Sequence, residues 1–156
     1  MLLAIETSCD DTAAAVLEGR KVLSNCIANQ NVIHKTYGGV VPEIASREHE
    51  KMLNNITIKA LKYASIDLNQ VQGIAVTNGP GLAGSLLTGV SFAKGLALGL
   101  GIKIISINHL EAHIIANLLE DPDIQFPFLC LLVSGGHTQL WLINDCLLYT
   151  SDAADE

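Results

Sequence analysis

Two histidines four residues apart are the side chains in this sequence best suited to chemistry. His109 and His113 stand in a segment that we expect to open a helix. Side chains four positions apart share one helix face, so both imidazoles can reach the same metal ion. Two ligands do not complete a metal site, and such pairs also occur as surface or helix-capping residues. The residues alone therefore leave metal binding and an ordinary surface pair both open.

The residue between the histidines does not suit a zinc protease. Such enzymes use the motif His-Glu-x-x-His, in which the glutamate is the general base. Here Glu111 follows the first histidine by two positions, about 200° round the helix. From there it cannot act beside a metal that the histidines hold. The sequence therefore lacks the base that a metalloprotease of this type requires.

Two turns carry hydroxyl groups beside acidic residues or glycines. In the turn from Ser8 to Thr12, the carboxylates of Asp10 and Asp11 could hold a hydrated cation near a phosphate, or could simply be solvated. The second turn ends the run Leu132-Val133-Ser134-Gly135-Gly136, where N–H groups and a hydroxyl could bind a phosphate or carboxylate. In a plain hairpin the two glycines would only permit positive φ. Each turn is thus a candidate ligand site with a structural alternative.

The glycine-rich segment Gly79-Pro80-Gly81-Leu82-Ala83-Gly84 matches the pattern G-x-G-x-x-G of dinucleotide-binding proteins. That use requires an acidic residue at the end of the next strand, but Gly99 to Asn108 contains no Asp or Glu. The segment also follows the fourth expected strand, not the first. Glycines at a helix start can still face an anion or a close-packed neighbour, and both remain open. A phosphate-binding loop with its lysine and the motif G-x-S-x-G are both absent from the sequence.

The hydrophobic pattern predicts an α/β protein in which a sheet positions these turns. Three short apolar runs near the start suggest strands, and later runs alternate between strand and helix periods. Strands joined through helices imply parallel pairing, and the first hairpin would add an antiparallel edge. The expected order βββαβαβα comprises strands over 2–5, 12–17 and 22–28, a helix over 42–64, a strand over 73–77, a helix over 85–100, a strand over 103–107 and a helix over 109–120.

A second, shorter part follows the last of these helices. The segment 121–127 contains two prolines and two aspartates and reads as a linker. The strands expected over 128–133 and 137–143 echo the first hairpin, which suggests the start of a second, similar lobe. The expected division is a first lobe over 1–121, a linker over 122–127, the opening hairpin of a second lobe over 128–145 and a tail over 146–156.

Composition excludes several classes of protein. The chain has 156 residues, of which 49% are hydrophobic and 16% charged, and its mean hydropathy is +0.37. These values predict a folded globular protein. Lys94 and Lys103 interrupt the most apolar stretch, so we expect a soluble, cytoplasmic protein with no membrane partner. With 9 Lys and Arg against 16 Asp and Glu, the formal charge is −7, which gives no basic footprint for nucleic acid.

Taken together, these segments resemble one family, the TsaD family of tRNA threonylcarbamoyladenosine transferases, formerly called glycoproteases or O-sialoglycoprotein endopeptidases. The resemblance covers about residues 1 to 145. Five segments in the family's order carry it, namely Ile5-Glu6-Thr7-Ser8-Cys9-Asp10-Asp11-Thr12, Gly38-Gly39-Val40-Val41-Pro42-Glu43-Ile44-Ala45-Ser46-Arg47-Glu48-His49, Gly79-Pro80-Gly81-Leu82, the histidine segment Asn108 to His113, and Leu132 to Leu140.

The resemblance implies a fold and an activity. The fold is the actin-like ATPase fold, a ribonuclease H-like architecture shared by sugar kinases, Hsp70 chaperones and actin, with two related lobes. The activity is transfer of a threonylcarbamoyl group from threonylcarbamoyl-adenylate to the adenosine next to the anticodon of tRNAs that read ANN codons. Implied partners are tRNA, a paralogous actin-fold protein of the TsaB type and a P-loop ATPase of the TsaE type.

The resemblance also implies roles for particular residues. His109 and His113 match the family's ligands for one divalent metal ion, iron or zinc. Leu132, Val133, Ser134, Gly135 and Gly136 match its substrate-binding stretch. Asp11 matches an acidic position that is usually Glu, and it is the candidate catalytic residue. The third protein ligand of the metal, an aspartate, belongs to a part of the family's sequence that is missing from this chain.

Family members are longer than this sequence, so the resemblance implies a truncated and inactive fragment. Residues 146–156 match nothing in the family at that point and are expected to be a non-native tail. Two other functions stay open as alternatives. One is a metal-dependent glycoprotein endopeptidase, and the other is a non-catalytic scaffold paralogue of the same fold.

Overall fold

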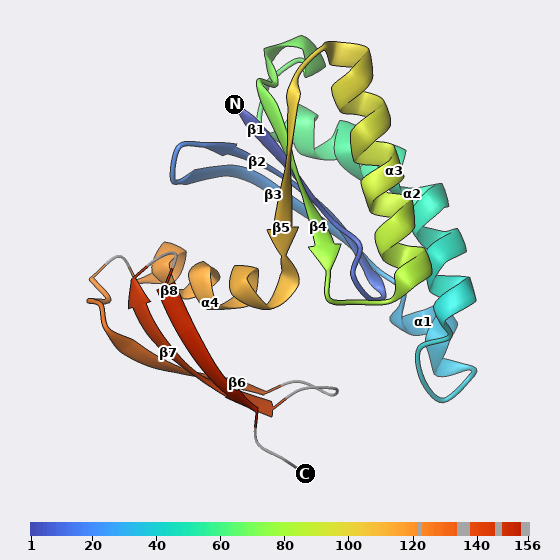
Figure 1. The fold of residues 1–156 in the computed structure, drawn as a ribbon. Coiled ribbons are helices and arrows are strands. Elements are labelled where there is room, and N and C mark those ends of the chain that lie inside the picture. The colour runs from blue at the N-terminus through green and yellow to red at the C-terminus, as the bar shows by residue number, and fades with distance from the viewer. Residues whose placement is uncertain (122, 134–137, 146–147, 154–156) are drawn as a thin grey trace. The chain divides into compact units, whose positions relative to one another are not determined.

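The computed structural model describes residues 1–121, 123–133, 138–145 and 148–153. The chain forms two compact units, Met1–His109 and Leu110–Glu156. Each unit contains its own sheet, as Figure 1 shows. The two units are therefore described separately.

The first unit is built on a five-stranded sheet with the order β3-β2-β1-β4-β5. Its strands are β1 Leu2–Glu6, β2 Asp11–Glu18, β3 Lys21–Asn29, β4 Gly73–Gly79 and β5 Lys103–Asn108. The pairs β1–β2 and β2–β3 are antiparallel, whereas β1–β4 and β4–β5 are parallel. The expected parallel sheet with an antiparallel edge is thus confirmed, and the parallel strands all end at one edge.

Helices α2 (Pro42–Tyr63) and α3 (Ala83–Leu100) pack on the same face of this sheet, as Figure 1 shows. Alternate strand residues face the helices, because side chains along a strand alternate between its two faces. The register aligns Leu3 with both Val16 and Ile74, and all three are buried. Apolar burial of this kind is the main stabilising contribution of the unit.

Helix α2 starts at Pro42, a residue favoured in the first helical turn, with Glu43 beside it. Its stripe of buried residues includes Ala45, His49, Leu53, Ile56 and Ala60. These positions recur every three or four residues, which is the spacing of one helix face. The helix therefore lies where the sequence predicts it, one residue shorter at its end.

Helix α3 is long and apolar enough, by length and composition, to cross a membrane. The same properties are typical of a core helix, and one face of α3 is buried in the first unit. That face consists of small residues, namely Ser85, Gly89, Ala93 and Ala97. Small side chains let the helix axis approach the sheet closely. The helix ends before Gly101, whose φ of 66° suits glycine at a helix C-terminus.

Two short elements of the first unit are absent from the expected order. Helix α1 spans Asn31–Lys35, and the 3₁₀ turn η1 spans Leu68–Gln70. Each is too short to show a hydrophobic period. Local hydrogen bonds specify them instead, such as that between His34 Nε2 and Gln30 Oε1 at 2.9 Å and that from the Asp67 amide to Gln70 Oε1 at 2.7 Å.

The second unit contains most of α4 (His109–Glu120) and a three-stranded antiparallel sheet of β6 (Phe128–Val133), β7 (Thr138–Asp145) and β8 (Leu148–Ala153). Its small core consists of Ile114, Trp141 and Ile143, joined by Leu110, Phe128, Cys130 and Leu132. By contacts, α4 groups with the hairpin from Leu110 onward, because Ile114 packs against β7. The expected lobe boundary after residue 121 stays a prediction.

The segment expected to be a tail contributes a strand to this second sheet. Leu148–Ala153 forms β8 and pairs antiparallel with β7, aligning Trp141 with Ser151. Backbone pairing needs no particular side chains, so a strand here does not decide whether the segment is native. That expectation stays a prediction.

Candidate functional site

Polar side chains gather where the three parallel strands of the first unit end. Glu6 is the last residue of β1, Thr77 lies near the end of β4, and His109 directly follows β5. The register places Ile5 beside Val76 and Thr77 beside Ile107, so the three polar residues come to one edge of the sheet. Ligands of open α/β sheets bind outside the carboxyl ends of the strands. This edge is therefore the candidate site.

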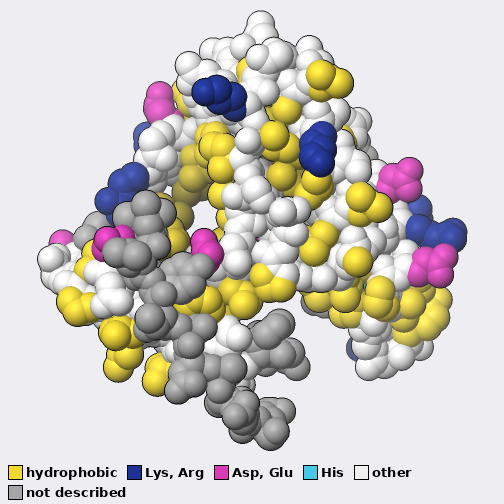
Figure 2. Space-filling view, in the orientation of Figure 1, with side chains coloured by type: hydrophobic (Ala, Val, Ile, Leu, Met, Phe, Trp, Pro, Cys, Tyr) yellow, Lys and Arg dark blue, Asp and Glu magenta, His cyan; other side chains and the backbone are white. Residues whose placement is uncertain are grey.

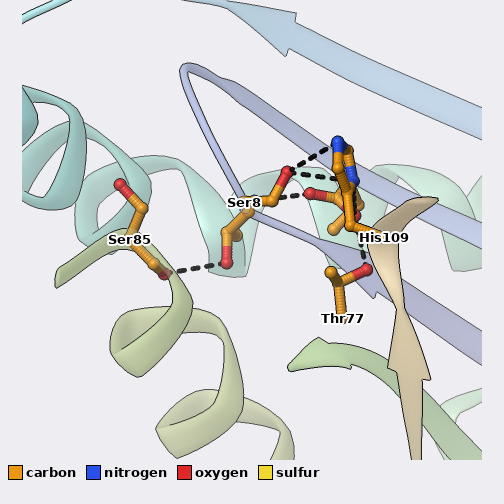
Figure 3. A network of polar contacts seen from close by, with 6 residues as sticks. Ser8, Thr77, Ser85 and His109 are labelled. Carbon is orange, nitrogen blue, oxygen red and sulfur yellow. Dashed lines mark hydrogen bonds and ion pairs between the residues drawn. The ribbon is translucent and has the colours of Figure 1, made fainter. Parts of the chain in front are cut away.

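The Glu6 carboxylate contacts Ser8, Thr77 and His109, the three residues of this group that Figure 3 labels. One oxygen, Oε1, accepts the backbone N–H of Ser8 at 2.5 Å. The other, Oε2, accepts the hydroxyl of Thr77 and lies 3.3 Å from Nδ1 of His109. Neither oxygen can move without losing a hydrogen bond, so the carboxylate has a fixed position.

These contacts favour the ionised form of Glu6. Burial by itself raises the pKa of this carboxyl group. Hydrogen bonds from His109, Ser8 and Thr77 outweigh the burial and lower the pKa to about 2. Glu6 is therefore a carboxylate at neutral pH, and its two oxygens act only as acceptors.

The imidazole of His109 lies between Glu6 and the hydroxyl of Ser8. Ser8 Oγ is 3.1 Å from Nδ1 and 3.5 Å from Nε2, and Figure 3 shows the Ser8 side chain turned toward the ring. Ser8 itself is buried, whereas about a quarter of the His109 side chain is exposed. The site thus combines an accessible imidazole with a hydroxyl and a carboxylate that do not move freely.

His113 lies one turn along α4 from His109 and is exposed. Its position in the helix is that of a second ligand on the same face, as the sequence predicts. Imidazole nitrogens suit zinc and iron, so the two donors fit the metal ion that the family resemblance implies. Within the described part of the chain, no group of three His, Cys, Asp or Glu side chains could hold a metal ion.

Helix α3 fixes the turn after β1 by close contact. Thr7 Oγ1 donates to the carbonyl of Ser85 at 2.9 Å, and the N–H of Leu82 donates to the carbonyl of Ser8 at 2.7 Å. A Cβ on Gly81 would lie 2.5 Å from that Ser8 oxygen. The glycine-rich segment thus has a close-packed neighbour, which is one of the two uses left open above.

Helix α2 holds the other end of the same turn through His49, which sequence reasoning missed. Its Nε2 lies 2.9 Å from the carbonyl of Cys9, and its Nδ1 lies 2.7 Å from Thr12 Oγ1. His49 is fully buried, and this desolvation lowers its pKa. A histidine in the apolar stripe between Ala45 and Leu53 is the sequence signal that would have revealed it.

The carboxylates of Asp10 and Asp11 make none of the Glu6 contacts just described. Asp11 is exposed, and its Oδ1 accepts the side-chain N–H of Asn29 at 2.7 Å, across the β2–β3 ladder. Desolvation and the neighbouring Asp10 raise the pKa of Cys9 to about 11, which keeps its thiol protonated at neutral pH. A protonated thiol is a poor nucleophile, and a catalytic role for Asp11 stays a prediction.

The expected substrate-binding stretch is described only in part. Leu132 and Val133 end β6, with Leu132 half-buried and Val133 exposed. Ser134, Gly135 and Gly136 lie outside the described residues. Their role in binding a substrate therefore stays a prediction.

Basic side chains do not form a patch on the face drawn in Figure 2. There Lys and Arg side chains lie singly among other groups, and acidic side chains stand near several of them. Helix α2 carries two salt bridges, Arg47 with Glu43 and Lys51 with Glu48. Both pairs include a largely exposed partner and contribute little to stability.

Comparison with known proteins gives a consistent family. A family model described as tRNA N6-adenosine threonylcarbamoyltransferase matches residues 21–155. A protein of that name from Acaryochloris marina is 52% identical over 161 residues, covering 99% of this chain and 45% of the relative. Another from Geotalea uraniireducens is 56% identical over 145 residues, covering 92% of the chain and 42% of the relative. The chain thus spans less than half the length of these curated relatives.

Among solved structures, the chain is similar to YeaZ from Pseudomonas aeruginosa. The TM-score is 0.63 at 18% identity, over 99% of this chain and 64% of that one. A second structure, of an uncharacterized protein similar to peptidase YeaZ from the same organism, gives a TM-score of 0.60 at 21% identity, over 89% of this chain and 62% of that one. At such identities the likeness is one of fold alone. It confirms the expected actin-like α/β fold.

Proposed function

The chain belongs to the family of tRNA N6-adenosine threonylcarbamoyltransferases, and on that premise we propose that its protein transfers a threonylcarbamoyl group. The donor is threonylcarbamoyl-adenylate, and the acceptor is the amine of the adenosine next to the anticodon in tRNAs that read ANN codons. Members of this family are transferases that act on tRNA. The observation that carries the proposal is this membership, over residues 21–155.

The donor is a mixed anhydride and is already activated. An enzyme therefore has to position it beside the amine and stabilise the charge that develops. The edge of the first sheet suits this task, because Thr77 fixes the Glu6 carboxylate and Glu6 in turn contacts His109 at the ends of three strands. Fixed polar groups of this kind lose little entropy when a substrate binds.

His109 and His113 would hold one divalent ion, iron or zinc, with a third protein ligand from outside this chain. When bound, such an ion supplies a Lewis acid for carbonyl or phosphate oxygens. The support is the donor type and the i, i+4 spacing at the start of α4. Ser134, Gly135 and Gly136, with Leu132 and Val133, would bind phosphate or threonyl oxygens of the adenylate.

The tRNA would be bound with the help of other chains or other parts of the protein. The formal charge of −7 works against nucleic-acid binding by these residues alone. We expect an actin-fold paralogue and a P-loop ATPase as partners, and a cytoplasmic location. The likeness to YeaZ supports the first partner only in that the two proteins share a fold.

Transfer by a protein that contains this chain tests the proposal. The assay supplies threonylcarbamoyl-adenylate, unmodified tRNA and the two partners, and measures labelled threonine on tRNA. We expect transfer, and a loss of at least about 100-fold in His109→Ala if the metal contributes a few kcal/mol to the transition state. Glu43→Gln, a change on the exposed side of α2, is the control and should retain the rate.

Other outcomes would contradict the proposal in different ways. A wild-type rate of transfer by His109→Ala would show that the metal has no part in the mechanism. Cleavage of a glycoprotein without transfer to tRNA would favour the endopeptidase. A protein that forms a normal complex with its partners but shows no transfer and no cleavage would favour the scaffold paralogue.

A further inference from the structure

We propose that Glu6 is a positioning residue for His109, in that its carboxylate keeps the proton on Nδ1 and so leaves the lone pair on Nε2 for a metal ion. This inference rests on the proposed function for the metal, but its main test needs no metal. Glu6, Ser8, Thr77 and His109 all belong to the first unit.

The first step is that Glu6 does not depend on His109 for its position. Its Oε1 accepts the Ser8 amide at 2.5 Å, and its Oε2 accepts the Thr77 hydroxyl. Both donors belong to the sheet or to the turn directly after β1, and Thr77 is buried. The carboxylate is therefore in place whatever the imidazole does.

The second step is that the Glu6 carboxylate requires the imidazole proton to be on Nδ1. Nδ1 of His109 lies 3.3 Å from Glu6 Oε2. A carboxylate has lone pairs but no proton to donate, so a hydrogen bond at this distance requires N–H at Nδ1. In a neutral ring the lone pair then belongs to Nε2. A hydrogen bond to one ring nitrogen thereby decides which nitrogen can bind a metal ion.

The third step is that the Ser8 hydroxyl does not determine the tautomer of His109. Its hydroxyl lies 3.1 Å from Nδ1 and 3.5 Å from Nε2. A hydroxyl can donate or accept by rotating about its C–O bond, so it suits either tautomer. Of these two groups, only the Glu6 carboxylate has a single possible role, that of acceptor. Carboxylates in this relation to a histidine are common at metal sites, where they orient the ring and raise its basicity.

The test reads the tautomer directly. Chain with ¹⁵N-labelled histidine is studied by long-range ¹H–¹⁵N correlation at about pH 8, where histidine is ordinarily neutral. A His109→Asn variant assigns the signals. We expect Nδ1–H in the wild type and in the control Glu43→Gln, and a shift toward Nε2–H in Glu6→Gln. A wild-type ring protonated at Nε2, or a Glu6→Gln spectrum equal to the wild type, would overturn the proposal.

A second variant provides the test if Glu6→Gln does not fold. Glu6→Gln keeps the size of the side chain, and a thermal melt shows whether it folds. If it does not, Thr77→Val removes one of the donors that hold Oε2 and leaves Glu6 in place. We then expect a smaller shift in the same direction, and an unchanged tautomer would contradict the inference.

Zinc titration of the same proteins separates this inference from the proposed function. We expect the affinity for Zn²⁺ to fall about 10- to 100-fold in Glu6→Gln and to fall as well in His113→Ala, which keeps the tautomer of His109. Equal affinity of wild type and Glu6→Gln would overturn the positioning role. If the wild type bound no Zn²⁺, two imidazoles without the third ligand would be too few to hold the ion, and the spectra by themselves would decide whether Glu6 sets the tautomer of His109.

Discussion

The buried imidazole of His49 links α2 to both ends of the turn between Cys9 and Thr12. Replacing it with Ala would leave the Cys9 carbonyl and the Thr12 hydroxyl without these partners and create a cavity. We expect His49→Ala to lower the free energy of unfolding by about 3 kcal/mol. Denaturant unfolding measures this, with the exposed neighbour Glu50→Ala as the control. A cost below that of Glu50→Ala would contradict the role of His49 in holding the turn.

The same residue should make stability depend on pH. Burial lowers the pKa of His49 in the folded state, so below about pH 6.5 the unfolded chain binds the proton more readily. The free energy of unfolding should therefore fall as pH falls from about 6.5 toward the lowered pKa. The difference between wild type and His49→Ala, followed from about pH 8 to pH 5, isolates this effect. A difference that stays constant would show that His49 titrates normally in the folded protein.

Ser134 and Gly135 should matter for the donor and not for folding. In a protein that transfers threonylcarbamoyl, we expect Ser134→Ala to lower kcat/KM for the adenylate about tenfold, the value of one lost hydrogen bond. Gly135→Val should cost more, because a side chain there would block close approach of the ligand. Melting temperatures near the wild type are part of the expected result. Unchanged kinetics in both variants would indicate that this segment is an ordinary hairpin turn.

At the scale of elements, the contact of α3 with the turn after β1 depends on glycine. A Cβ on Gly89 would lie 2.2 Å from Thr7 Oγ1, whereas a Cβ on Gly95 in the same helix meets nothing within 4 Å. Gly89→Ala should therefore cost about 3 kcal/mol of stability through overpacking. Gly95→Ala should stabilise the helix by up to about 1 kcal/mol, because alanine loses less entropy there. Thermal melts of the two variants give the comparison, and equal effects would contradict the close packing.

Elements with a long hydrophobic period could be predicted from the sequence, and short or non-local features could not. The period over α2 extends through more than five turns, so its bounds differ from the prediction by one residue. Helix α1 has five residues and no period to detect. Glu6 and Thr77 lie 71 positions apart, and only the adjacency of parallel β1 and β4 brings them together. Hydrophobic patterns specify faces of elements, whereas strand order decides which chain segments meet.

At the scale of the whole molecule, the two units differ in how much core they have. The first unit buries residues from four strands and two helices in one cluster, whereas the described side chains of the second unit include three buried core residues. Small cores contribute little stability. We expect a polypeptide of these 156 residues to show no transfer of threonylcarbamoyl to tRNA, even with partners supplied. Measurable modification in the transfer assay would contradict this.

The second sheet leaves one apolar face exposed, which should make the polypeptide associate. Along β6, every second side chain is exposed, and Leu129, Leu131 and Val133 are each more than 60% exposed. Exposed apolar strands favour pairing between chains. We expect Leu131→Lys to reduce the association seen by size exclusion without lowering the melting temperature. Leu132→Lys, on the face packed against α4, should instead lower the melting temperature. A monomeric wild type, or equal effects of the two lysines, would contradict the assignment of these faces.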